Sequence, residues 1–157
     1  MDAENNTPLV SVCMTAYNHE DYIAEAIESV LAQQTSFGME LVLGEDCSTD
    51  RTGPICREYA AKYPDRIRLV TSPGNVGMRA NYRRTFDACR GKYVAYLDGD
   101  DWWTDPQKLE LQVELMESDP GCGMCADHGM GTGKKKSDFH VLCGYQKYAD
   151  PRRRPGG

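Results

Sequence analysis

Short apolar segments alternate with segments of helical periodicity along the first 128 residues, and this alternation constrains the fold more than any other feature. The apolar segments are nearly continuous, as expected for strands that are buried on both faces of a sheet. The stretches between them repeat their apolar residues every three or four positions, which is typical of amphipathic helices. Such strand–helix repeats need right-handed crossovers, so they predict an α/β, Rossmann-like fold with a mainly parallel sheet flanked by helices.

The predicted elements follow one another closely. Strands are predicted at 9–14, 41–43, 67–70 and 93–97, with 123–126 as a fifth candidate. Helices are predicted at 21–33, 50–62, 78–89 and 105–118. We expect Ser48 or Asp50 to cap the second helix, and Met78, Tyr82 and Phe86 lie one turn apart in the third.

Polar segments follow the predicted strands, and in parallel sheets ligands bind beyond the carboxyl ends of the strands. The most acidic of them is Asp98-Gly99-Asp100-Asp101. Carboxylates about 6–7 Å apart repel each other by about 2–3 kcal/mol per pair, and a divalent cation would relieve that repulsion. Oxygen ligands suit Mg²⁺ or Mn²⁺, either of which can bridge a diphosphate. The alternative is a solvated Asp-Gly turn.

Three further segments hold candidate binding residues, each with a structural alternative. Asp46, after the second strand, could bind a base or ribose, or could belong to a helix cap. Tyr17, after the first strand, could stack on a base or pack at the sheet edge. Arg79 follows a Gly-rich turn at a helix N-terminus, where anions bind, although such a turn can be purely structural.

Charge is divided unevenly along the chain. The first 128 residues carry 11 basic and 22 acidic side chains, whereas residues 129–157 carry seven basic and two acidic ones. An acidic body of this kind excludes nucleic acid as a partner. It is compatible with an anionic ligand only where a cation mediates the contact.

The four polar segments, taken in order, resemble the N-terminal half of family 2 glycosyltransferases, which have the GT-A fold. The resemblance covers residues 8 to about 128. The matching stretches are Val10-Ser11-Val12-Cys13-Met14-Thr15-Ala16-Tyr17-Asn18, Glu28-Ser29-Val30-Leu31-Ala32-Gln33-Gln34, Glu45-Asp46-Cys47-Ser48-Thr49-Asp50-Arg51-Thr52, Asn75-Val76-Gly77 and Tyr96-Leu97-Asp98-Gly99-Asp100-Asp101.

This resemblance implies transfer of a sugar from a nucleoside diphosphate donor to the hydroxyl of a carbohydrate or lipid-linked acceptor, as in cell-surface polysaccharide biosynthesis. By analogy the donor is a UDP-sugar. Thr15 and Tyr17 would lie against the nucleobase, Asp46 would hydrogen-bond to it, and Arg79 would contact base or phosphate.

The same resemblance implies a divalent metal, Mn²⁺ or Mg²⁺, as the cofactor. Asp100 would be the principal ligand through the Asp-x-Asp motif. Asp98 would contact both the ribose and the metal, and Asp101 would assist. The metal would offset the charge that develops on the leaving diphosphate.

The sequence departs from the family after His128. We therefore divide the chain into a donor-binding domain, 1–128, and a basic tail, 129–157, that is irregular and does not match the family. No residue matches the family's general base, and we expect the chain to be truncated before the acceptor half. The alternative to a transferase is therefore a non-catalytic or vestigial nucleotide-sugar-binding fragment.

Two rival classes of protein depend on particular residues of this sequence. A nucleotidylyltransferase would need a glycine-rich basic loop after the first strand, and residues 15–20 contain no glycine. A zinc site could draw on Cys122, Cys125, His128, His140 and Cys143, but their spacing is irregular.

The remaining expectations concern location and cysteines. No apolar stretch approaches the roughly 20 residues of a membrane span, and residues 1–8 do not resemble a signal peptide. We expect a cytoplasmic protein, with peripheral membrane association and self-association left open. The seven cysteines are expected to be reduced thiols, with Cys13 and Cys89 in the core.

Overall fold

The computed structural model describes residues 7–127 and 140–144 and confirms an α/β fold built on one six-stranded sheet. The strands are β1 (Val10–Ala16), β2 (Met39–Glu45), β3 (Ile67–Val70), β4 (Tyr93–Asp98), β5 (Met124–Asp127) and β6 (His140–Gly144). The helices are α1 (Ile23–Leu31), α2 (Thr52–Lys62), α3 (Met78–Asp87) and α4 (Lys108–Ser118). The strand order is β3-β2-β1-β4-β6-β5, and its first four strands are parallel.

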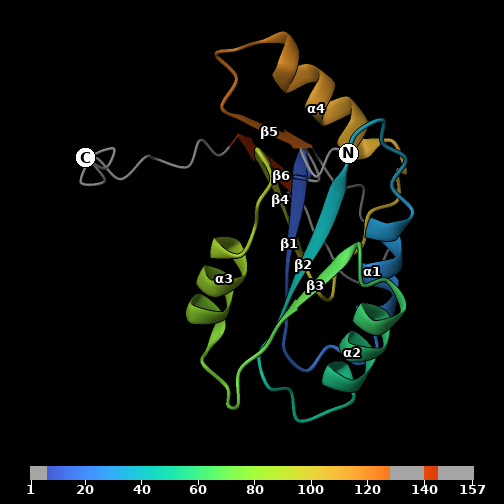
Figure 1. Ribbon diagram of the computed structural model, residues 1–157, viewed down its shortest axis with the longest axis vertical. Helices are drawn as coiled ribbons and strands as arrows, with labels where there is room; N and C mark the ends of the chain where they lie inside the picture. The colour runs from blue at the N-terminus through green and yellow to red at the C-terminus, as the bar shows by residue number, and fades with distance from the viewer. Residues whose placement is uncertain (1–6, 128–139, 145–157) are drawn as a thin grey trace, which may run out of the picture.

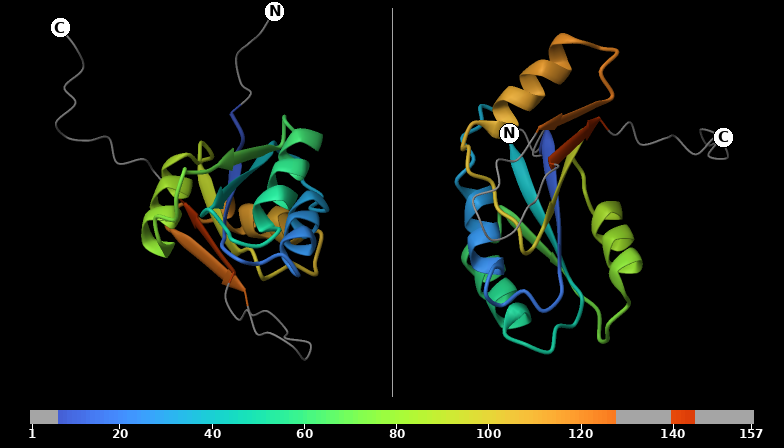
Figure 2. Two further views of the ribbon diagram at one scale, coloured as in Figure 1. Left: turned by 90° about the horizontal axis from the view of Figure 1, so that it is seen from below. Right: turned by 180° about the vertical axis from the view of Figure 1, so that it is seen from behind.

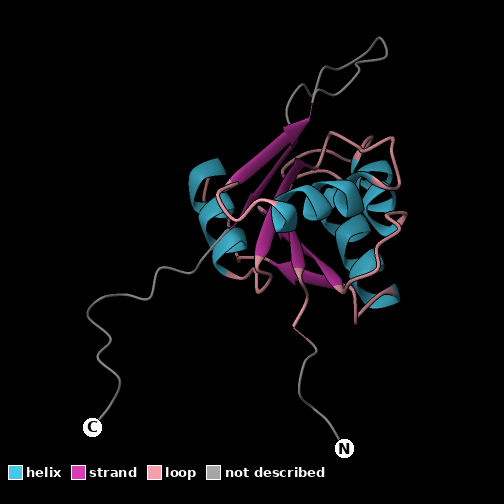
Figure 3. Cartoon of the chain, turned by 90° about the horizontal axis from the view of Figure 1, so that it is seen from above, coloured by secondary structure: helices cyan, strands magenta, loops and turns pink. Residues whose placement is uncertain are grey.

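Helices cover both faces of the sheet. In Figure 1, α3 lies on one face, α1 and α2 lie on the other, and α4 sits at one end beside β5. The views of Figure 2 and Figure 3 show the same layering from other directions. Within the described ranges, no helix has the length and apolar character needed to cross a membrane.

The side chains of β1 alternate between the two layers. Val10, Val12 and Met14 belong to the larger core, which lies against α1, α2 and α4. Cys13 points to the other face and packs with Cys89 in a smaller core near α3. Both are buried free thiols, as expected. Because side chains alternate along a strand, β1 contributes residues to both cores.

Of the three residues that the sequence places one turn apart on α3, only Phe86 packs against the smaller core. Met78 is 80% exposed and Tyr82 39%, whereas Asn81 and Thr85 are fully buried. The reason is a close approach of the helix to β2 at Gly44, where an added Cβ would lie 1.9 Å from Thr85 Oγ1. The Asn81 amide uses this approach to donate to the Gly44 carbonyl at 2.9 Å.

The predicted boundaries of the helices and strands hold to within three residues, but the predicted cap of α2 is wrong. The helix begins at Thr52, and its N-cap residue is Arg51, whose side chain makes no capping hydrogen bond. Asp50 Oδ1 instead accepts a hydrogen bond from the Thr52 amide, two residues away, at 2.9 Å.

Strand β6 lies inside the stretch 129–157, for which sequence analysis expected no regular structure. It pairs antiparallel with both β4 and β5. Its formation satisfies the backbone groups on the side of β4 that faces away from β1, which would otherwise be a bare sheet edge. Residues 128–139 and 145–157 lie outside the described residues, so the division at residue 128 stays a prediction.

An ion pair between the partly exposed Arg90 and the buried Glu40 holds the amino ends of the strands together. Arg90 donates from Nη2 and Nε to Glu40 Oε2 at 2.8 and 3.1 Å, and Ser11 Oγ donates to Glu40 Oε1 at 2.7 Å. Burial alone would raise the pKa of Glu40, but the hydrogen bonds from Arg90 and Ser11 outweigh burial and lower it. The pair links the turn before β4 to β1 and β2.

Replacing Arg90 tests this pair. Arg90→Ala leaves the Glu40 carboxylate buried with fewer donors, so we expect unfolding free energy to fall by about 1–3 kcal/mol at neutral pH in urea titrations. The control is Arg83→Ala, since the Arg83–Asp87 pair is 80% and 60% exposed and should change stability by less than about 0.5 kcal/mol.

The same pair has a defined pH dependence. Because the folded pKa of Glu40 is lowered below its ordinary 4.5, its stabilisation is present above that value and is lost as the pH falls through the folded pKa. The difference between Arg90→Ala and the unsubstituted chain should therefore shrink in acid. Equal losses in both arginine variants would contradict the account.

Candidate functional site

The candidate site lies where the sheet changes direction between β1 and β4. From β1 the chain builds outward through β2 to β3, and β4 then adds to the other side of β1. Ligands of parallel α/β sheets bind at this switch point. The register pairs Thr15 at the end of β1 with Asp98 at the end of β4.

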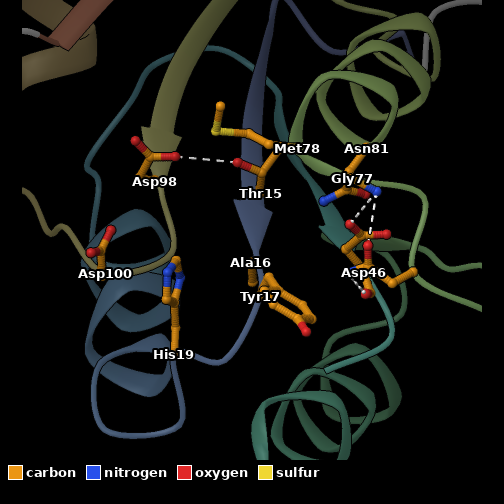
Figure 4. A pocket seen from close by; sticks show the side chains of 11 residues that line it. Thr15, Ala16, Tyr17, His19, Asp46, Gly77, Met78, Asn81, Asp98 and Asp100 are labelled. Atoms are coloured by element: carbon orange, nitrogen blue, oxygen red, sulfur yellow. Dashed lines mark hydrogen bonds between the residues drawn. The ribbon is translucent and has the colours of Figure 1, made fainter. Parts of the chain in front are cut away.

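A cleft of about 430 Å³ opens at these strand ends. Figure 4 shows Asp98, Asp100 and His19 on one side, Asp46 and Gly77 on the other, and Tyr17 between them. The cleft is lined by Thr15, Ala16, Tyr17, His19, Asp46, Asn75, Gly77, Met78, Asn81, Asp98 and Asp100.

The acidic turn gathers three carboxylates. Asp98, Asp100 and Asp101 each offer an oxygen, and these oxygens all lie within 4.8 Å of one another. The turn is held by the Asp101 amide, which donates to the Asp98 carbonyl at 3.0 Å, and by the Gly99 amide, which donates to the Thr15 carbonyl at 2.8 Å. Clustered carboxylate oxygens are suitable ligands for Mg²⁺ or Mn²⁺.

Two hydroxyl groups hold one oxygen of Asp98. Thr15 Oγ1 donates to Asp98 Oδ1 at 3.2 Å, and the Tyr96 hydroxyl donates to the same oxygen. Burial and the hydrogen bond to Asp98 raise the pKa of Tyr96, so this phenol stays protonated as a donor. Asp98 Oδ1 is therefore engaged by two hydroxyl groups, which fix the position of the carboxylate at the end of β4.

Asp46 fastens a loop on the other side of the cleft. Its carboxylate accepts hydrogen bonds from the Val76 and Gly77 amides at 2.8 and 2.9 Å. Its carbonyl accepts from the Asn75 side chain at 3.0 Å. A carboxylate has about four acceptor positions, so these two bonds leave capacity for a ligand. Asp46 therefore shapes the loop as well as lining the cleft.

Arg84, on α3, forms an ion pair with Asp46. Arg84 Nη2 lies 3.7 Å from Asp46 Oδ1 and donates to the Glu45 carbonyl at 2.9 Å. Its Nε donates to Asn81 Oδ1 at 2.9 Å. Arg84 thus joins α3 to the end of β2 and supplies a positive charge beside a buried carboxylate.

Gly99 allows the acidic turn to lie against β1. A Cβ added at Gly99 would lie 2.9 Å from both His19 Nδ1 and the Thr15 carbonyl oxygen, and 3.0 Å from Ala16 Cβ. Two of these contacts are with the fixed end of β1. The turn therefore approaches the strand only because residue 99 has no side chain.

The structure brings together most of the residues that the sequence singled out. Thr15, Tyr17, Asp46, Asp98 and Asp100 line the cleft, and Asp101 belongs to the carboxylate cluster. Arg79 is exposed and does not line the cleft.

Five residues at or behind the cleft were not predicted. Asn81 and Arg84 lie one turn apart on α3, but the sequence analysis used this spacing only for apolar residues. The other three residues belong to no sequence pattern that marks them as site residues. The five residues are His19, Met78, Asn81, Arg84 and Tyr96.

The zinc alternative receives no support from the described residues. Neither Cys122 nor Cys125 belongs to a described group of three potential metal ligands. The side chains of His128, His140 and Cys143 lie outside the description, so this alternative stays untested.

The chain belongs to glycosyltransferase family 2. The sequence profile of the family described as Glycosyl transferase family 2 matches residues 11–155. The family expected from the sequence motifs is therefore confirmed. The match also includes most of the stretch 129–157, which we expected to fall outside the family.

Two curated proteins are similar to this chain over most of its length. The Mycobacterium tuberculosis protein Rv1520 is 41% identical over 116 residues, which cover 74% of this chain and 34% of the relative. The Bacillus subtilis protein TuaG, provisionally named a teichuronic acid biosynthesis glycosyltransferase, is 40% identical over 112 residues, covering 71% of this chain and 43% of TuaG. The chain thus spans less than half the length of either relative.

Solved structures confirm the GT-A-type fold. The mannosyltransferase PcManGT from Pyrobaculum calidifontis, in complex with GDP-Man and Mn²⁺, superposes with a TM-score of 0.65 at 26% identity, covering 74% of this chain and 34% of PcManGT. S. aureus TarS, residues 1–349, in complex with UDP, gives a TM-score of 0.63 at 23% identity, covering 82% of this chain and 38% of TarS.

A methyl group at residue 99 tests the close approach of the acidic turn. Gly99→Ala forces the turn away from Thr15 and Ala16, so we expect a loss of about 1–3 kcal/mol in unfolding free energy from urea titrations. Gly74→Ala is the matched control, because no atom lies within 4 Å of a Cβ added there. A Gly99→Ala chain as stable as Gly74→Ala would contradict the packing described.

Proposed function

We propose that this chain binds a nucleoside diphosphate sugar together with a divalent cation, as the donor-binding part of a glycosyltransferase. The observation that carries the proposal is the carboxylate cluster of Asp98, Asp100 and Asp101 at the rim of a cleft of about 430 Å³. The likeness to PcManGT, whose structure contains GDP-Man and Mn²⁺, supports it.

The residues available fit a divalent cation. The three carboxylates supply oxygen ligands from one short turn, and their mutual repulsion favours a bound cation. We assign Asp100 as the principal ligand, with Asp98 and Asp101 assisting. When bound, Mn²⁺ or Mg²⁺ would neutralise charge on the departing diphosphate.

The nucleoside would lie toward Tyr17 and Asp46. Tyr17 is 43% exposed at the cleft, so its ring is available to stack on a base. Thr15 would lie against the same base, and the remaining acceptor positions of Asp46 would bind its N–H groups. Asp98 would also contact the ribose. Asp46 would also support nucleotide binding indirectly, because its hydrogen bonds hold residues 75–77 at the edge of the cleft.

The reaction proposed for the complete enzyme is sugar transfer to the hydroxyl of a carbohydrate or lipid-linked acceptor. The chain's own contribution would be to bind and orient the donor. No general base is assigned among the described residues. Turnover by this chain separates a transferase from a module that only binds the donor, because nucleotide binding fits both.

Nucleotide titration tests the proposal. We expect calorimetry to show binding of UDP or GDP that requires Mn²⁺, and we expect Asp100→Asn to weaken it by at least about tenfold, because a cation ligand is lost. Asp87→Asn is the matched control, since Asp87 is an exposed aspartate at the end of α3 and does not line the cleft. Cation-independent binding, or equal losses in both variants, would contradict the proposal.

A further inference from the structure

The cleft is acidic, although the ligand proposed for it is an anion. Three of its eleven lining residues are aspartates, and none is an arginine or lysine. His19 is the one lining residue whose side chain can carry a positive charge. A diphosphate bound beside these aspartates would therefore find a single basic side chain among the described residues of the cleft.

Hydrogen bonds hold the backbone of His19 in place. Its amide donates to Thr52 Oγ1 at 2.8 Å. Its carbonyl accepts from the amides of Tyr22 and Ile23 at 2.9 and 2.8 Å, at the start of α1. These three hydrogen bonds fix the backbone position from which the imidazole reaches the cleft, so the backbone needs no ordering when a ligand binds.

The imidazole packs against the acidic turn through one edge. A Cβ added at Gly99 would lie 2.9 Å from His19 Nδ1, and Nδ1 is buried without a hydrogen-bond partner among the described residues. In Figure 4 the ring stands beside Asp100, on the side of the cleft where Asp98 lies. Because Nδ1 is covered while the side chain lines the cleft, Nε2 is the nitrogen available to a ligand.

His19 is not a member of the carboxylate cluster. The group whose ligand atoms all lie within 4.8 Å of one another contains only Asp98, Asp100 and Asp101. A hydrogen bond from the imidazole to the anion is therefore favoured over direct ligation of the cation. Such a bond to a charged oxygen is shorter and stronger than one between neutral groups.

We propose that His19 Nε2–H donates a hydrogen bond to a phosphate oxygen of the diphosphate group, beside the cation bound by the aspartates. This inference rests on the proposed function, because it assigns one more residue to the same donor. His19 would then be a hydrogen-bond donor to the negative charge that develops on the diphosphate as the sugar leaves.

Two substitutions at residue 19 test the proposal. His19→Phe keeps a ring against Gly99 but removes both nitrogens, whereas His19→Gln keeps a side-chain N–H near the position of Nε2. With saturating Mn²⁺, we expect His19→Phe to weaken GDP or UDP binding by about tenfold to a hundredfold in calorimetry. His19→Gln should recover most of that loss. The control is Asp21→Asn, an exposed residue in the same loop that does not line the cleft.

Two further readouts separate this role from others. Electron paramagnetic resonance measures Mn²⁺ affinity without nucleotide, and this affinity should be unchanged in His19→Phe. If Mn²⁺ affinity falls as much as nucleotide affinity does, His19 is a cation ligand and the proposal is overturned. The urea midpoint of His19→Phe should also be unchanged. If His19→Phe loses nucleotide binding only in proportion to a loss of stability, the proposal is overturned as well. Undiminished nucleotide binding by His19→Phe would contradict the inference and leave the proposed function intact. Failure of the unsubstituted chain to bind either nucleotide would contradict both.

Discussion

The parallel pairing of β1 with β4 is the interaction on which the rest of the site depends. Its register places Thr15 opposite Asp98, and the Gly99 amide extends the same hydrogen bonding to the Thr15 carbonyl. The acidic turn is thereby held against the strand that carries Tyr17 on its following loop. The switch point of the sheet thus fixes the separation between the carboxylates and the aromatic side of the cleft.

The opposite wall depends on buried polar contacts. Asp46 is 2% exposed, and it holds residues 75–77 through backbone and side-chain hydrogen bonds. Arg84 and Asn81 join that wall to α3, and Gly44 permits the close packing that brings them there. A buried carboxylate is tolerated where donors and an opposite charge surround it. The wall is therefore held by the chain's own contacts, which lowers the entropic cost of binding.

The sequence predicted the strands and the polar residues that follow them, because these depend on strand periodicity. It did not predict which side of α3 faces the sheet, because that depends on how the helix is rotated. Apolar runs located the four parallel strands, and the polar residues after them line the cleft because parallel strands end at one edge. Arg79 does not line the cleft, since it lies two residues before Asn81, about 200° around a helix that packs through Asn81 and Thr85. Tyr96 and His19 gave no pattern of their own, because their relevance comes from contacts with Asp98 and Gly99 across the fold. Strand β6, which pairs with both β4 and β5, was missed because residues 129–157 show no strand–helix periodicity.

A crystal structure with GDP and Mn²⁺ tests the central claim most directly, because anomalous scattering locates manganese independently of the nucleotide. The account predicts one Mn²⁺ peak bound to carboxylate oxygens of the turn from Asp98 to Asp101, the diphosphate beside it, and the base next to Tyr17 and Asp46. A manganese peak away from this turn, or a nucleotide bound outside the cleft, would contradict it.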